Sequence, residues 1–154
     1  ATCCGLATAA MAGFEATLSA NIMVAFFIPA IVYLADAIGT QSEAIAVRGL
    51  SLTRTGIAHL MAGELRTGML IGACLGAASF FPVWLAFGNA RLAASVSTAI
   101  FAAGSIAAAL GFLLPWAFAR AGIDPAHGSG PLATVIQDTL TVVVYLAVVV
   151  AFRP

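Results

Sequence analysis

Long hydrophobic runs alternate with shorter polar connections along the chain. Each of the last four runs is long enough to cross a bilayer as an α-helix, which needs ~20 apolar residues. The pattern therefore predicts an all-α integral membrane protein with five membrane-spanning helices, the second continuing as a polar helix to Arg48. The five hydrophobic runs lie at residues 1–14, 18–38, 68–87, 92–118 and 131–152.

The first run is too short to cross a membrane by itself. At ~1.5 Å per residue it covers about 21 Å, whereas the hydrocarbon core of a bilayer is ~30 Å thick. The chain starts at Ala1 without a methionine or a basic leader segment. We therefore expect a truncated first helix that begins upstream of Ala1, and a soluble domain could precede it.

The polar connections predict how the helices are oriented. The longest connection spans residues 48–66, "GNAR" at 88–91 is a tight turn, and residues 119–131 form a loop rich in glycine and proline. The first and third of these lie on one side of the membrane and hold four of the six arginines. Because arginine is enriched in cytoplasmic loops, we expect that side to be cytoplasmic.

Small residues recur at helical spacing in the third and fourth runs. Gly68, Gly72 and Gly76 are each four residues apart, and Gly104 and Gly111 lie on a similar stripe. Such stripes allow two helix backbones to approach closely in a membrane, so we interpret them as packing faces.

The fifth run carries a polar face. Thr134, Gln137, Asp138, Thr141 and Tyr145 fall on one side of a helix. A helix that enters the membrane near residue 131 would bury the carboxylate ~10 Å deep, which is costly unless the group is paired or hydrated. The chain has no lysine, and no arginine lies within the apolar runs. The acid is therefore either protonated or faces water and cations, and we predict that this face lines a pore.

The second run shows a similar face. Proline removes a backbone donor and weakens the helix, and Gly39 adds flexibility. Two interpretations remain: a broken helix whose free carbonyls line an ion site, or a simple kink with the aspartate at the membrane interface. The residues on this face are Pro29, Tyr33, Asp36, Thr40 and Glu43.

The composition agrees with a membrane protein. Hydrophobic residues make up 62% of the chain and charged residues 8%, whereas a soluble domain has about 25% charged residues. The outer surface must therefore contact lipid. A net charge of zero leaves no basic face, so nucleic-acid binding is not expected.

The sequence does not predict an enzyme. His59 and His127 fall in the expected polar connections, and Ser129 of the "HGSG" stretch is expected in a loop. An intramembrane hydrolase would need a serine inside the membrane and a histidine on another span. Cys3, Cys4 and Cys74 lack metal-ligand spacing.

Three stretches resemble the transmembrane domain of the MgtE-type magnesium channel and transporter family. "FEATLSANIMVAFFIP" is similar to the family's Phe-Glu start and its apolar run ending in proline. "GTQSEAIAVRGLS" is similar to the Gly-x-Gln segment, and "DPAHGSGPLATVIQDTLTVVVY" to the fifth-helix motif. Order and spacing agree over residues 14–152.

The resemblance implies a homodimer of five-helix protomers in a bacterial or archaeal plasma membrane. Its pore would run along the dimer interface, lined by the second and fifth helices, with cytoplasmic regulatory domains before the first helix. The family's essential aspartate matches Asp138, and Thr134 matches the residue that offers its carbonyl one turn earlier. The second helix departs from the family, because Asp36 stands where a glycine is usual and the apolar residue Ala37 stands where an asparagine is usual.

We therefore expect residues 1–154 to form a single transmembrane domain that conducts divalent cations, most of all Mg²⁺. A hydrated ion would bind Asp138 of both protomers, helped by Thr134 and Thr141. On the second helix, Asp36, Thr40 and Glu43 are further candidate ligands, and the two acids could form a second ring nearer the cytoplasm. The alternatives are transport of Mn²⁺, Co²⁺ or Na⁺, and a membrane module that assembles through its glycine faces without transporting anything.

Overall fold

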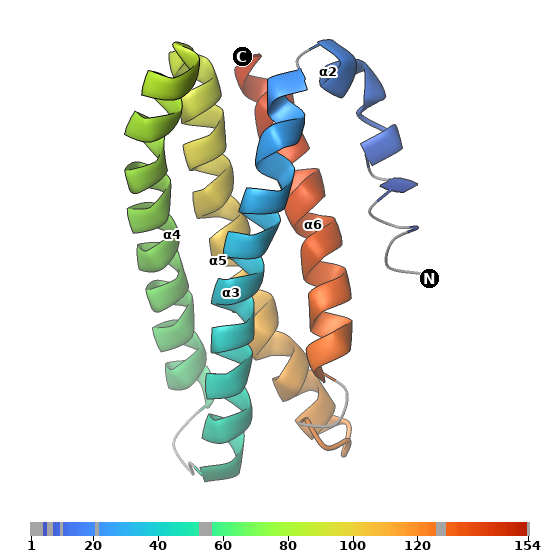
Figure 1. Ribbon diagram of the computed structural model, residues 1–154. Coiled ribbons are helices and arrows are strands. Elements are labelled where there is room, and N and C mark those ends of the chain that lie inside the picture. Colours follow the sequence, from blue (N-terminus) through green and yellow to red (C-terminus); the bar gives the residue numbers. More distant parts are fainter. Residues whose placement is uncertain are drawn as a thin grey trace.

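The computed structural model describes residues 5, 8–9, 11–20, 22–52, 57–125 and 129–153, and the regular structure in these residues is helical. Four long helices run side by side and form a bundle (Figure 1). A short helix, α2, precedes them. The elements are α2 (Glu15–Ala20), α3 (Ile22–Leu52), α4 (Ile57–Phe87), α5 (Ala90–Arg120) and α6 (Ser129–Phe152).

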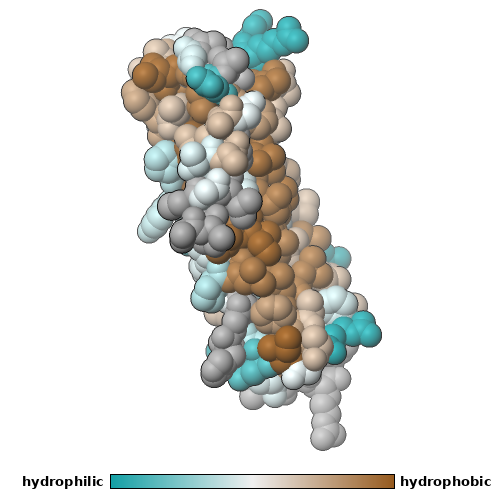
Figure 2. Space-filling model, turned by 90° about the vertical axis from the view of Figure 1, so that its right-hand side faces the viewer, coloured by the Kyte–Doolittle hydropathy of each residue, from teal (hydrophilic) through white to brown (hydrophobic). Residues whose placement is uncertain are grey.

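The four long helices are each long and apolar enough to cross a membrane. Hydrophobic side chains form a continuous band along the middle of the face in Figure 2, and the most strongly hydrophilic ones lie toward its two ends. These observations confirm the expected all-α membrane architecture. The run at residues 1–14 falls largely outside the described residues, so a fifth membrane-spanning helix stays a prediction.

The helices extend further than the hydrophobic runs. α3 continues to Leu52, which confirms the expected polar extension, and α4 begins at Ile57 instead of near Gly68. Much of the expected polar connection is therefore helical, and His59 lies in α4 instead of a loop. The added stretch is rich in Ala, Leu, Met, Glu and Arg, which favour helix whether or not they are apolar.

Pro29 does not break α3. The helix is continuous from Ile22 to Leu52 with this proline inside it, so of the two interpretations the broken helix is wrong. Pro82 and Pro115 lie inside α4 and α5 in the same way. Proline removes one backbone hydrogen bond, and in a membrane bundle the bonds and packing on either side can hold the helix together.

α5 is the central helix of the bundle. It packs against α3, α4 and α6, and in Figure 1 it crosses behind α3. Small buried residues such as Ala103, Ala107 and Ala108 lie on its packed faces. The core of the chain therefore follows α5. Two of the helices that pack on it, α3 and α6, carry Asp36 and Asp138.

The glycine stripe of α4 packs against α5, as the sequence predicted. A Cβ atom on Gly72 would lie 3.2 Å from the carbonyl oxygen of Phe101, and one on Gly76 would lie 2.6 Å from that of Ser97. Gly104 of α5 faces the Cα atom of Gly72 in return. Larger side chains at these positions would separate the two backbones.

The turn between α4 and α5 is as tight as expected. Gly88 has a φ of 64°, which residues with a Cβ rarely adopt. The Asn89 side chain then accepts hydrogen bonds from the amides of Arg91 and Leu92 and caps the start of α5.

Candidate functional site

The packing of α3 against α6 brings two acids of one chain together. Gln137 of α6 donates a hydrogen bond to the backbone of Ala35 on α3. These two residues directly precede Asp138 and Asp36, so the like charges of the two acids lie near one another. Both side chains are half-buried, within helical segments long enough to span a membrane. Asp36 is therefore a neighbour of Asp138, and Glu43 lies two helical turns further along α3.

One oxygen of the acidic pair is unusual. The Oδ1 atom of Asp36 is buried and has no hydrogen-bond partner among the described residues. A buried carboxylate oxygen without a partner is unfavourable, because it has lost water and gained nothing in return. A water molecule, a proton or a cation would each relieve this cost.

Gln137 links the two helices next to both acids. Its Nε2 atom donates a hydrogen bond of 3.0 Å to the carbonyl oxygen of Ala35, and the side chain is only 2% exposed. A Cβ atom on Gly39 would overlap the amide group of Gln137. Gly39 is thus explained by close packing inside a continuous helix, and not by the flexibility that the sequence suggested.

The three threonines of the predicted site occupy different environments. Thr141 is buried in the bundle and Thr134 is half-buried, one turn before Asp138. Thr40 is exposed, and its hydroxyl donates to the backbone carbonyl of Asp36 at 2.8 Å. Thr134 thus lies one turn from Asp138 on α6, and Thr40 lies one turn from Asp36 on α3. Thr141 lies inside the protomer.

Glu43 lies toward the end of α3, away from the pair. It is half-buried, and its Oε1 atom would lie 3.6 Å from a Cβ atom on Gly130, at the start of α6. Among the residues described here, no three His, Cys, Asp or Glu side chains are grouped as metal ligands. Within one chain, the described acids thus offer a pair and not a cluster.

Tyr145 does not belong to a pore face in this chain. It is 1% exposed, and its hydroxyl donates to the carbonyl oxygen of Val24 at 2.7 Å. Expecting it to line a pore was wrong because a polar stripe on a helix can also face a neighbouring helix. Gln137 also faces a neighbouring helix. The periodicity of the sequence does not distinguish polar residues that face a pore from polar residues that bond to a neighbouring helix.

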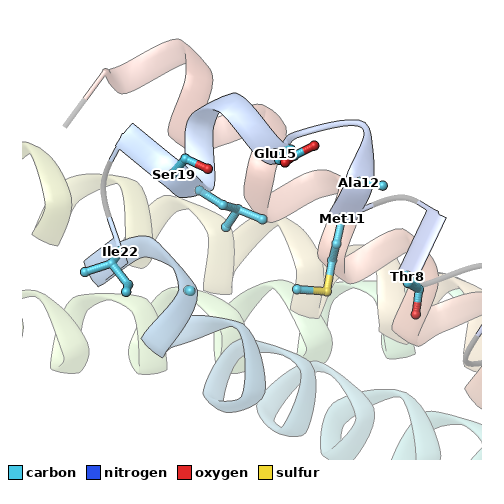
Figure 3. A pocket seen from close by; sticks show the side chains of 8 residues that line it. Thr8, Met11, Ala12, Glu15, Ser19 and Ile22 are labelled. Carbon is cyan, nitrogen blue, oxygen red and sulfur yellow. The ribbon is translucent and has the colours of Figure 1, made fainter.

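Two surface grooves lie away from the acidic pair. The first lies between the N-terminal segment and the start of α3, and it is mainly apolar (Figure 3). The second lies where the ends of α3 and α5 meet. Residues lining the first include Thr8, Met11, Ala12, Glu15, Ser19 and Ile22.

Comparison with known proteins finds one family in both a family model and individual relatives. The model of the MgtE family, described as a divalent cation transporter, matches residues 28–148, which include Asp36 and Asp138. The magnesium transporter MgtE of Bacillus subtilis is 32% identical over 142 residues, covering 90% of this chain and 32% of that protein. The protein of the same name from Enterococcus faecalis is 31% identical over 152 residues, covering 96% and 34%.

A third relative, the magnesium transporter MgtE of Thermus thermophilus, is 28% identical over 141 residues, covering 88% of this chain and 31% of that protein. The chain thus spans about a third of the length of these relatives.

Proposed function

Because the chain belongs to the MgtE family of divalent cation transporters, we propose that it conducts divalent cations across a membrane, with Mg²⁺ as the principal ion. The observation that supports this proposal is the acidic pair of Asp36 and Asp138 on two apolar helices, which the hydrogen bond from Gln137 to Ala35 joins directly beside both acids. Two neighbouring carboxylates repel, and a divalent cation between them removes the repulsion and supplies the missing partner of the Asp36 oxygen. Relatives named as magnesium transporters make Mg²⁺ the first ion to test.

The ion would bind with its water shell. Mg²⁺ gives up water reluctantly and is commonly held through only a few carboxylates. A half-buried pair of acids can accept hydrogen bonds from the waters of such an ion without replacing them. The backbone carbonyl of Thr134, one turn before Asp138, is a further acceptor on the same helix.

A second copy of the chain would complete the pathway. Pro29, Tyr33, Ala37 and Thr40 are exposed along one side of α3, and Tyr33 is 74% exposed. Tyr33 and Thr40 place hydroxyl groups on this side, and a small or polar helix surface is better suited to another protein surface or to water than to lipid. We propose that two protomers meet along α3 and α6, which would bring two acidic pairs to one axis.

The orientation follows from the arginines. α3 and α5 end, and α4 and α6 begin, at the same end of the bundle (Figure 1). Arg48 and Arg120 lie near the ends of α3 and α5. We propose that this end faces the cytoplasm of a bacterial or archaeal cell, as the excess of arginine in these connections favours.

Flux through lipid vesicles tests the proposal. With the full chain in vesicles that contain a Mg²⁺-sensitive dye, we expect uptake above that of protein-free vesicles, with Mn²⁺ and Co²⁺ competing. Equal uptake with and without protein, together with no stabilisation of the protein by Mg²⁺, would support a non-transporting membrane module instead. Uptake that follows Na⁺ and ignores divalent cations would also overturn the assignment.

A further inference from the structure

We infer that Gln137 is a positioning residue of the cation site, holding α6 against α3 so that Asp36 and Asp138 keep one mutual geometry. The inference rests on the proposed function, because it assigns a role to a residue that supports the acidic pair. Gln137 would not touch the ion. It would act through the two acids next to its contacts.

The contact ties together the residues immediately before both acids. Gln137 precedes Asp138, and its amide bonds to the carbonyl of Ala35, which precedes Asp36. In a regular helix this carbonyl also accepts the amide hydrogen of the residue four positions later, which is Gly39. A carbonyl oxygen has two lone pairs, so both bonds can form. A single side chain thus sets the register of α6 on α3 at the level of the acidic pair.

Glycines on two helices leave little freedom at this point. Gly39 lacks the Cβ atom that would displace the Gln137 amide. On α5, Gly111 lies against the carbonyl oxygen of Gly39, and a Cβ atom there would be 3.1 Å from the amide nitrogen of Glu43. α3 is therefore in close contact with α5 and α6 around residue 39, one turn after Asp36. Close packing of this kind holds a site in place before its ligand arrives.

The contact from Gln137 opposes the electrostatic repulsion between the two acids. Without a cation, the charges of Asp36 and Asp138 repel and favour separation of α3 from α6. The buried bond from Gln137 opposes that separation. A site that is already assembled does not lose binding free energy to reorganisation when the ion enters.

The test replaces Gln137 by methionine in the full chain. Gln137→Met keeps the length and approximate volume of the side chain and removes the donor. We expect the Mg²⁺ concentration for half-maximal flux to rise about 10-fold, as when residues that orient metal ligands are changed. The maximal rate per inserted protein should change much less.

Tyr145→Phe is the matched control. It also removes a buried hydrogen bond from α6 to a backbone carbonyl of α3, but at Val24, three helical turns from the pair. We expect Tyr145→Phe to lower the unfolding temperature and to leave the half-saturating Mg²⁺ concentration unchanged. Equal effects of the two variants on half-saturation would overturn the inference, since Gln137 would then be only a packing residue.

Two further variants keep the test decisive. Gly39→Ala should also raise the Mg²⁺ concentration for half-maximal flux, because its methyl group displaces the Gln137 amide. It replaces Gln137→Met as the test if that variant does not insert into the vesicles. In an Asp36→Asn background, Gln137→Met should have a much smaller effect, because residues acting through one another are not additive. An unchanged half-saturation for Gly39→Ala, or full additivity, contradicts the inference. A wild-type chain that carries no Mg²⁺ would contradict the proposed function itself.

Discussion

We expect Asp138→Asn to reduce Mg²⁺ flux at least about 100-fold in vesicles that contain equal amounts of inserted protein. The substitution keeps the shape of the side chain and removes the charge on α6 that neighbours Asp36. A hydrogen bond to a charged group contributes ~1.5–3 kcal/mol, and the dimer that we propose would lose one such group from each chain. Since 1.4 kcal/mol corresponds to a factor of ten, a 100-fold loss is a modest expectation.

Glu64→Gln is the control for Asp138→Asn, because it tests the effect of losing one negative charge elsewhere in the chain. Glu64 lies on α4, and the substitution removes one negative charge from a different helix. We expect flux within about two-fold of wild type, because this substitution leaves both acids of the pair unchanged. Flux of Asp138→Asn equal to that of Glu64→Gln would show that Asp138 does not bind the ion.

Asp36→Asn has opposite effects on the protein with and without Mg²⁺. In metal-free buffer it removes the repulsion between Asp36 and Asp138 and the charge on a carboxylate with one buried, unpartnered oxygen. The unfolding temperature should therefore rise. Added Mg²⁺ should then stabilise the variant much less than wild type, because the stabilisation by a ligand falls when its affinity for the folded state falls.

Circular dichroism of the detergent-solubilised full chain, heated with and without Mg²⁺, measures both effects. Thr40→Val is the control on the same helix, because it removes a hydroxyl that bonds to the backbone of Asp36 without changing a charge. A lower unfolding temperature for Asp36→Asn in metal-free buffer would mean that Asp36 has a stabilising partner and does not form a repelling pair.

The helices and their packing faces were predictable because their signals are local. Hydrophobic runs identified four helices long enough to cross a membrane, and the spacing of Gly68, Gly72 and Gly76 identified the face that packs on α5. The start of α4 was placed too late because helix propensity continues through polar residues where hydrophobicity stops. The unbroken α3 at Pro29 likewise depends on the surrounding bundle, which the sequence of α3 alone does not contain.

The candidate site was only partly predictable. An acid inside an apolar run drew attention to Asp138 and Asp36, but their proximity depends on the register of α6 against α3. That register follows from Gln137 reaching Ala35 across the space at Gly39, a contact between residues far apart in the chain. Helical periodicity groups Gln137 and Tyr145 with Asp138 on one polar face, and it does not tell which of them bond to a neighbouring helix.

The central claim is that a divalent cation binds at the Asp36–Asp138 pair. The most direct measurement is a crystal structure of the full chain grown with Mn²⁺, which prefers the same hard oxygen ligands as Mg²⁺ and has an anomalous signal. We expect an anomalous peak about 4–5 Å from the carboxylate oxygens of Asp138, the distance through one bound water. The peak should vanish in Asp138→Asn. Bound Mn²⁺ elsewhere in the membrane region, with none at this pair, would contradict the account.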